Sequence, residues 1–104
     1  MIAQLKKGVL EFCILHIISK DTLYGYEIMN TITSIFTDTN EATVYSILRR
    51  LLSDDYTECY SQSSTNGPPR KYYKITIKGR QYLEKSFSDW KFICNSVEKI
   101  IEEK

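Results

Sequence analysis

Positive charge gathers on one short stretch of the chain, residues 66–80, which reads NGPPRKYYKITIKGR. It holds five basic side chains and no acidic one: Arg70, Lys71, Lys74, Lys78 and Arg80. The whole chain has 104 residues and a formal net charge of only +1, so this density is local. Cationic side chains grouped in this way contact phosphate oxygens, which position a protein on a nucleic acid without reading its sequence.

Residues 41–54 predict a helix whose outward face could read base edges. Its aliphatic residues recur at helical spacing and define a core face: Val44, Ile47, Leu48, Leu51 and Leu52. The opposite face carries small and hydroxyl side chains and then a cation: Ala42, Ser46, Arg49 and Ser53, flanked by Thr43, Arg50 and Tyr45. Ala42 and the Thr43 methyl group can contact a thymine methyl, Ser46 can donate or accept, and Arg49 can reach guanine or phosphate. Arg50, at the side, is expected to contact the DNA backbone.

Two further helices are expected before this one. Residues 3–19 carry an apolar stripe that is too wide for a one-sided surface helix, which indicates burial on two faces. Residues 24–36 place apolar side chains at helical spacing: Ile28, Ile32, Ile35 and Phe36. Asn40 then provides an N-cap for the helix at 41–54. After that helix, two runs rich in strand formers enclose a loop at 65–69 that contains Gly and two prolines, which predicts a hairpin.

The last stretch, residues 76–104, predicts one long helix with an apolar seam. Thr76 can cap this helix. Its apolar residues are separated alternately by four and three positions: Leu83, Phe87, Trp90, Cys94, Val97 and Ile101. A helix of about 27 residues would be about 40 Å long at 1.5 Å per residue, longer than a domain of this size covers alone. We therefore expect the seam to form a dimer interface, with part of the helix also packing on the first helix of its own chain.

Three helices followed by a two-stranded hairpin is the order of a winged helix-turn-helix. The sequence thus predicts a mainly α fold with a small β-hairpin, made of a DNA-binding domain at 1–75 and a C-terminal dimerisation helix at 76–104. The helix at 41–54 would enter the major groove of DNA, and the basic hairpin would be the wing. The expected DNA-binding residues are Tyr24, Asn40, Ala42, Thr43, Tyr45, Ser46, Arg49, Arg50, Arg70, Lys71 and Lys74.

Four segments resemble the successive signatures of PadR-type transcriptional regulators: QLKKGVLEFCILHII, YGYEIMNTI, NEATVYSILRRLLSDD and GPPRKYYKITIKG. The resemblance covers nearly the whole chain, and the short length with a single C-terminal helix is similar to the compact branch of that family. It implies a homodimeric repressor that binds a palindromic operator in double-stranded DNA. One departure is Asp55, in the turn after the recognition helix, where the family usually has Gly; this bears on the angle of the wing.

In the multidrug-binding members that this chain resembles, an aromatic compound enters a pore at the dimer interface and releases the DNA. A Trp on the last helix stacks on that compound, and Trp90 occupies the matching position. Carried over in the same way, the residues facing the pore are Gly8, Glu11, Phe12, Leu15, His16, Phe87, Trp90 and Cys94. The implied ligand is a planar aromatic or cationic small molecule. Two interpretations stay open for Trp90, ligand stacking or a plain interface anchor in a repressor without a ligand.

Enzymatic chemistry has no support in the sequence, which lacks a Gly-rich phosphate loop, a nucleophile elbow and an H-E-x-x-H motif. The three cysteines are widely spaced, and the single histidine has no partner at metal-ligand spacing, so neither a disulfide framework nor a metal site is expected. No cofactor is implied. The lack of a long apolar run and of a secretion signal predicts a cytoplasmic protein without a membrane span. A winged helix that binds another protein is the alternative, but it would favour an apolar or acidic face on residues 41–54.

Overall fold

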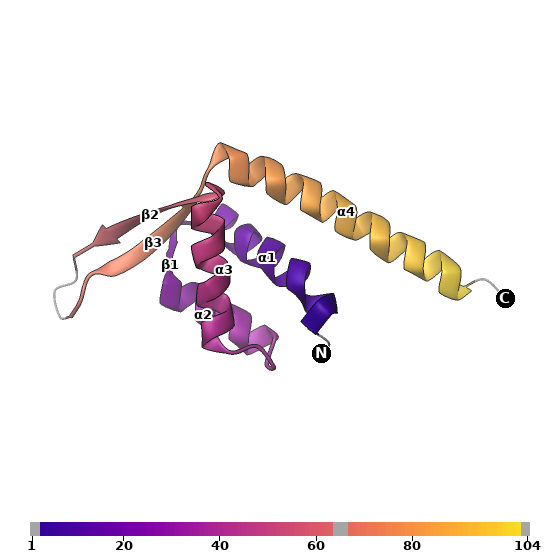
Figure 1. Ribbon diagram of the computed structural model, residues 1–104, viewed down its shortest axis with the longest axis horizontal. Helices are drawn as coiled ribbons and strands as arrows, with labels where there is room; N and C mark the ends of the chain where they lie inside the picture. The colour runs from indigo at the N-terminus through magenta and orange to yellow at the C-terminus, as the bar shows by residue number, and fades with distance from the viewer. Residues whose placement is uncertain (1–2, 64–66, 103–104) are drawn as a thin grey trace.

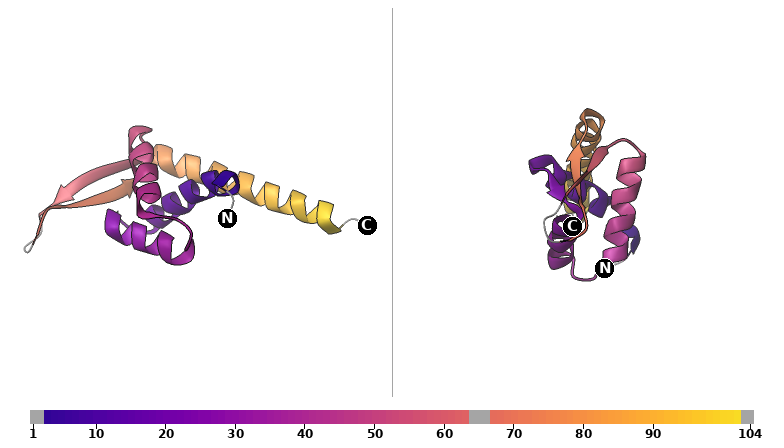
Figure 2. Two further views of the ribbon diagram at one scale, coloured as in Figure 1. Left: turned by 60° about the horizontal axis from the view of Figure 1, so that its bottom comes forward. Right: turned by 90° about the vertical axis from the view of Figure 1, so that its left-hand side faces the viewer.

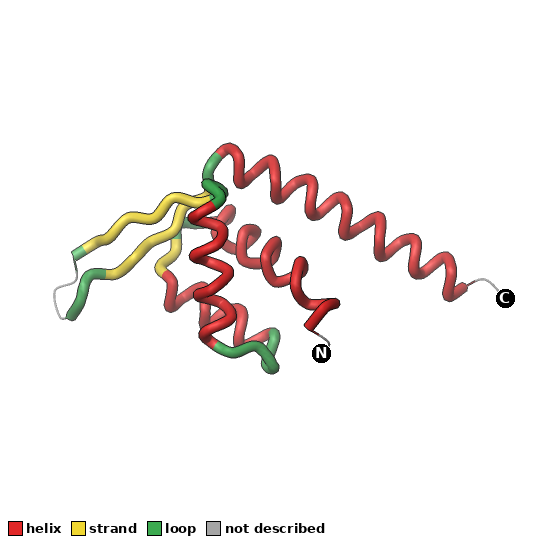
Figure 3. Tube along the Cα trace, viewed as in Figure 1, coloured by secondary structure: helices red, strands yellow, loops and turns green. Residues whose placement is uncertain are grey.

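A computed structural model describes residues 3–63 and 67–102 of the protein (Figure 1). The helices and strands follow in the order α1 (Ala3–Lys20), β1 (Leu23–Tyr24), α2 (Gly25–Ile35), α3 (Glu41–Ser53), β2 (Thr57–Gln62), β3 (Arg70–Ile75) and α4 (Ile77–Glu102). The mainly helical winged helix-turn-helix with a long last helix is therefore confirmed (Figure 3). Residues 1–2 at the start of the expected DNA-binding domain, residues 65–66 of the expected wing loop and residues 103–104 at the end of the expected dimerisation helix lie outside the described residues.

The sheet has three antiparallel strands in the order β1-β3-β2, one more than the expected hairpin. The added strand, β1, is only two residues long, and it pairs Leu23 with Tyr73 and Tyr24 with Tyr72. Side chains alternate along the second half of β3, where Tyr73 and Ile75 turn into the core while Lys74 is exposed. A two-residue strand leaves no periodic pattern in a sequence, which is why β1 was not predicted.

The core lies between α1, α2, α3 and the inner face of β3. Its fully buried side chains are Leu10, Ile14, Leu15, Ile28, Ile32, Val44, Leu48 and Leu51. The wide apolar stripe of α1 is explained, since that helix packs against α2, α3, α4 and the sheet. Leu52, expected in the core, is instead 37% exposed. It sits at the margin of the apolar face of α3, in the last turn of that helix.

The start of α4 is fastened to the segment that follows α3. Thr76 caps α4 as predicted, because the Gly79 amide donates to Thr76 Oγ1 at 2.9 Å. Thr76 Oγ1 itself donates to the carbonyl of Asp55 at 2.7 Å, and Lys78 Nζ donates to the carbonyl of Asp54 at 3.0 Å. From this anchored end α4 runs outward, and its C-terminal half extends beyond the other elements (Figures 1 and 2). The molecule as a whole measures 62 × 30 × 20 Å.

Asp55 has a φ of 64°, in the left-handed region that disfavours side chains other than Gly. The turn thus keeps the backbone conformation that Gly would adopt there. We expect Asp55→Gly to raise the free energy of unfolding by about 0.5–1 kcal/mol, since relief of the left-handed strain exceeds the added chain entropy of Gly. Urea denaturation measures the change. The matched control is Asp54→Gly, at a φ of −88°, which should bring no gain; equal effects at both positions would contradict the explanation.

Candidate nucleic-acid interface

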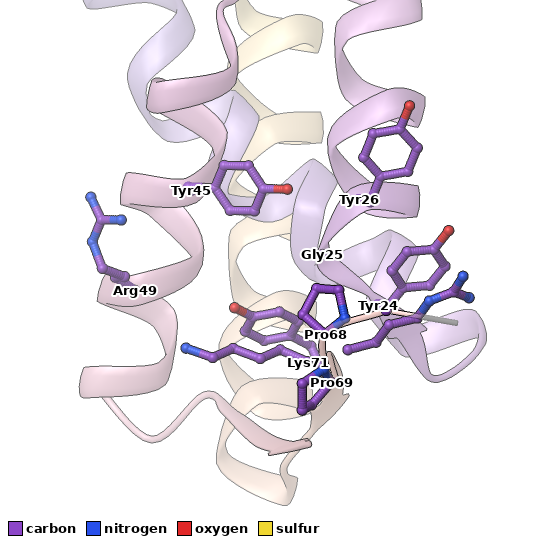
Figure 4. Close-up of a pocket in the computed structure, with 11 residues that line it drawn as sticks. Tyr24, Gly25, Tyr26, Tyr45, Arg49, Pro68, Pro69 and Lys71 are labelled. Atoms are coloured by element: carbon purple, nitrogen blue, oxygen red, sulfur yellow. The ribbon is translucent and has the colours of Figure 1, made fainter. Parts of the chain in front are cut away.

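A groove of about 510 Å³ lies between the wing and the helices α2 and α3 (Figure 4). Its lining residues are Tyr24, Gly25, Tyr26, Tyr45, Arg49, Gly67, Pro68, Pro69, Arg70, Lys71 and Tyr73. Figure 4 shows Tyr45 and Arg49 on one side and Tyr24 and Tyr26 on the other, with Lys71 between them. Among the described residues, three cations and no carboxylate line this groove, so its electrostatics favour an anionic guest such as a phosphate backbone.

The recognition helix α3 begins at a cap that the sequence predicted. The Thr43 amide donates to Asn40 Oδ1 at 2.9 Å, and Thr43 Oγ1 donates to the same oxygen at 3.0 Å. Asn40 therefore holds the first turn of α3 in place. Ala42, Ser46 and Arg49 are all exposed on the outward face, as expected. This face is open to a nucleic acid along its whole length, because the aliphatic residues of α3 point into the core.

Tyr45 is fixed by close packing at the start of α2. A Cβ atom added at Gly25 would lie 3.2 Å from Tyr45 Cε1 and 3.5 Å from Tyr73 Cε2, so α2 approaches both rings closely. Burial raises the pKa of the Tyr45 hydroxyl, and the nearby charges of Glu41 and Tyr26 raise it further. Burial likewise raises the pKa of Tyr73. Tyr45 is partly exposed in the wall of the groove and its hydroxyl can donate a hydrogen bond there, whereas Tyr73 is only 6% exposed and belongs to the core.

A row of tyrosines crosses the outer face of the sheet and holds Arg70. The stacked rings of Tyr60 and Tyr72 lie 5.7 Å apart, and Tyr72 and Tyr24 are also 5.7 Å apart. The Arg70 guanidinium lies over the Tyr24 ring, 4.8 Å from its centroid, an attractive cation–π arrangement. Tyr26 stacks on Tyr24 at 6.2 Å and was missed from the sequence. The signal was available, since Tyr24 and Tyr26 flank Gly25 at the start of a helix.

The remaining expected DNA-binding residues lie outside this groove. Lys74 is on the outer face of the sheet, opposite Glu58 of β2. A second hollow of about 580 Å³ between α1 and the other side of α3 is lined by Lys6, Leu10, Asp38, Thr39, Asn40, Ala42, Thr43, Ser46, Ile47 and Arg50. The predicted residues of α3 are therefore divided between its two flanks, with Tyr45 and Arg49 on the wing side and the others on the α1 side.

Arg50 has a partner that the sequence did not suggest. Its guanidinium forms an ion pair with Glu11 Oε2 of α1, so the expected contact of Arg50 with a DNA backbone competes with an internal carboxylate. Glu11 Oε1 in turn accepts a hydrogen bond from the Tyr82 hydroxyl of α4 at 2.6 Å. This bond, with burial, raises the pKa of Tyr82 to about 12. Both oxygens of Glu11 are thus engaged within the chain.

The other residues expected at the pore are divided between surface and core. Phe12 of α1 packs against Trp90 and Phe87 of α4, with ring centroids 5.9 Å and 6.5 Å apart. Gly8 and His16 are exposed, Trp90 is 37% exposed, and Cys94 is partly buried. Leu15 is the correction, because it is fully buried in the core and cannot share the outward face of α1.

Known proteins share both the sequence pattern and this fold. The sequence profile described as the transcriptional regulator PadR-like family matches residues 14–85, which include the groove and the first turns of α4. The chain belongs to the PadR-like family. That membership makes it a DNA-binding transcriptional regulator rather than an enzyme.

Several solved structures resemble this PadR-like regulator over nearly its whole length. A PadR-like transcriptional regulator from Bacillus cereus is 37% identical, with 97% of this chain and 99% of that chain covered and a TM-score of 0.85. A Streptococcus transcriptional regulator is 32% identical, with 95% and 98% covered and a TM-score of 0.85. A curated protein from Lysinibacillus sphaericus, uncharacterized protein X, is 31% identical over 99 residues, 92% of this chain and 91% of that protein.

The structure adds two observations on other kinds of site. Within residues 3–63 and 67–102, no three or more His, Cys, Asp or Glu side chains are grouped so that they could hold a metal ion. Over the same residues, no helix has the length and apolar content that crossing a membrane requires.

Proposed function

We propose that this PadR-like regulator is a homodimeric repressor that binds a palindromic operator. The observation that carries the proposal is the groove beside α3, whose lining, over the part of the chain that the structure describes, holds three cations and no carboxylate. The exposed face of α3 would lie in the major groove, where Arg49 reads a base or contacts phosphate. Arg70, held over Tyr24, and Lys71 would contact phosphates of the adjoining backbone.

The second copy would cover the apolar side of α4. Four aliphatic side chains in the C-terminal half of this helix are about half exposed or more: Ile93, Val97, Ile100 and Ile101. Exposed apolar rows of this kind mark interaction surfaces, and a two-fold axis would bury the same row on both chains. The two recognition helices of such a dimer would read half-sites about 34–36 Å apart, one turn of DNA.

Selection of bound sequences from random DNA tests the proposal directly. A palindrome with half-sites one turn apart should emerge, and Arg49→Ala should weaken binding to it by about 1–3 kcal/mol while the fold is kept. The matched control is Lys99→Ala, which also removes a positive charge but from the exposed far end of α4. Arg49 would be excluded from the site if its folded Ala variant bound the selected operator as tightly as wild type.

The wing should act through phosphates rather than bases. Lys71→Ala should weaken operator and random DNA about equally and reduce the slope of log affinity against log salt by about one unit. Lys99→Ala removes the same charge from the exposed far end of α4 and serves as the control. A loss of sequence preference without a loss of random binding would show instead that Lys71 reads a base.

The proposed ligand is a planar aromatic molecule that stacks on Trp90. Phe12 and Phe87 pack beside this indole within the chain. The rest of the Trp90 side chain stays exposed at the surface that the second copy would cover. Because Arg50 neutralises Glu11, stacking rather than charge would select the guest. A ligand releases DNA only if it prefers a dimer with wrongly spaced recognition helices.

Fluorescence of Trp90, the only Trp in the chain, tests this part. Planar aromatic dyes should quench it at micromolar concentration and weaken operator binding in parallel, and Trp90→Phe should reduce dye binding without loss of the dimer. If a broad panel of dyes changes neither the fluorescence nor the affinity for DNA, Trp90 is an interface anchor and the repressor has no ligand at this position.

A further inference from the structure

Three helices meet at the carboxylate of Glu11. This residue lies in the middle of α1, its Oε2 pairs with Arg50 of the recognition helix, and its Oε1 accepts from Tyr82 of α4. The partners are far from Glu11 in the sequence, so the contact exists only in the folded chain. The Glu11 side chain is 15% exposed, and a carboxylate so covered requires both partners.

The Tyr82 end of this linkage is held firmly. The Tyr82 ring stacks on Tyr56 with centroids 4.2 Å apart and planes 8° from parallel. Tyr56 directly follows the turn after α3, and its carbonyl accepts from the Thr76 amide at 3.1 Å. The first turns of α4 therefore form one packed unit with the C-terminal end of α3, and Glu11 joins α1 to both helices of that unit.

Glu11 also lies beside the surface that the proposed dimer and ligand would use. Its neighbour in sequence, Phe12, packs on Trp90 and Phe87 of the exposed seam. Adjacent residues of α1 therefore contact the seam on one hand and the recognition helix on the other. A shift of α4 at the seam would reach α3 through this short polar connection.

We propose that Glu11 is a positioning residue, which through Arg50 and Tyr82 fixes the angle between α3 and α4 and so sets the half-site spacing that the dimer accepts. The inference rests on the proposed function, since spacing has a meaning only for a dimer on DNA. Glu11 contacts no DNA in this arrangement. Its effect on binding passes through the orientation of the recognition helix.

Operators with altered spacing provide the test. The wild-type dimer is measured against the operator that it selects and against versions with one base pair added or removed between the half-sites. Glu11→Gln keeps the size of the side chain and removes its charge. We expect Glu11→Gln to bind the selected operator about tenfold more weakly, as for loss of a charge-assisted hydrogen bond, and to lose most of the discrimination between spacings. Random DNA should be bound at least as tightly as by wild type, because its phosphate contacts remain and Arg50 loses the carboxylate that competes for it.

Two further variants separate positioning from general stability. Tyr82→Phe removes only the hydroxyl that donates to Glu11, and it should relax the spacing preference in the same direction without adding to the effect of Glu11→Gln in the double variant. Asp89→Asn breaks the exposed pair with Lys85 on the same helix and should leave the preference unchanged. If Glu11→Gln fails to fold by circular dichroism, Tyr82→Phe alone decides the question.

The outcomes distinguish this inference from the function on which it rests. If the wild-type protein is monomeric, or selects no sequence with a defined spacing, the proposed function itself is contradicted. A wild-type dimer with a clear spacing preference that Tyr82→Phe and a folded Glu11→Gln both retain overturns the positioning role alone. A relaxed preference, with binding to random DNA no weaker than that of wild type, supports it.

Discussion

Gly79→Ala should lower the free energy of unfolding by about 3 kcal/mol, although Ala is the better helix former. An added Cβ would lie 2.0 Å from the carbonyl oxygen of Tyr56 and 2.8 Å from Cγ1 of Ile75. The Tyr56 oxygen cannot retreat freely, because it accepts the Thr76 amide at the start of α4. The substitution would therefore push α4 away from the end of α3. Urea denaturation measures the loss.

Gly8→Ala is the matched control, since both glycines lie in helices. No atom of the described residues lies within 4 Å of the Cβ position at Gly8, so helix propensity decides the effect there. We expect Gly8→Ala to stabilise the protein by about 0.5–1 kcal/mol. Opposite signs at the two positions would establish the close approach of α4 to Tyr56. Stabilisation at both would show that the packing at Gly79 is looser than the structure has it.

Local features of the fold could be read from the sequence because short-range physics decides them. The Asn40 cap, the aliphatic face of α3 and the Thr76 cap each depend on residues within one or two turns of each other. The alternation along β3 likewise follows from strand geometry, which places Tyr73 and Ile75 on the buried face. Such patterns identify the elements and, through their order, the winged helix.

The connections between elements could not be read in this way. Glu11 and Arg50 are 39 residues apart, and Glu11 and Tyr82 are 71 apart, so no periodicity links them. The sequence placed Leu15 with Phe12 and His16 on the pore-facing side of α1, but Leu15 is buried in the core. Its burial depends on which side of α1 the other helices cover. The groove also depends on tertiary packing, because it exists only where the wing borders α2 and α3. Tertiary packing, rather than local preference, settles these features.

Val97→Asp should convert the proposed dimer into monomers that bind the operator poorly. Val97 is 47% exposed in the C-terminal half of α4, so the change leaves the core of the single chain untouched. At a two-fold interface each chain would bury the new carboxylate in an apolar surface. The two carboxylates would also lie near each other and repel. An uncompensated buried charge costs about 3–5 kcal/mol, more than a hundredfold in the dimer dissociation constant.

Sedimentation at micromolar concentration and titration of the selected operator measure the two effects of Val97→Asp. Monomers would contact one half-site at a time and would lose the gain in affinity that comes from binding both half-sites together. Asn95→Asp places the same charge on an exposed position away from the seam, and it should leave both assembly and DNA binding intact. A dimeric Val97→Asp variant would remove the C-terminal half of α4 from the interface. A monomeric wild type would contradict the proposed dimer itself, since no second copy would then cover the exposed aliphatic row of α4.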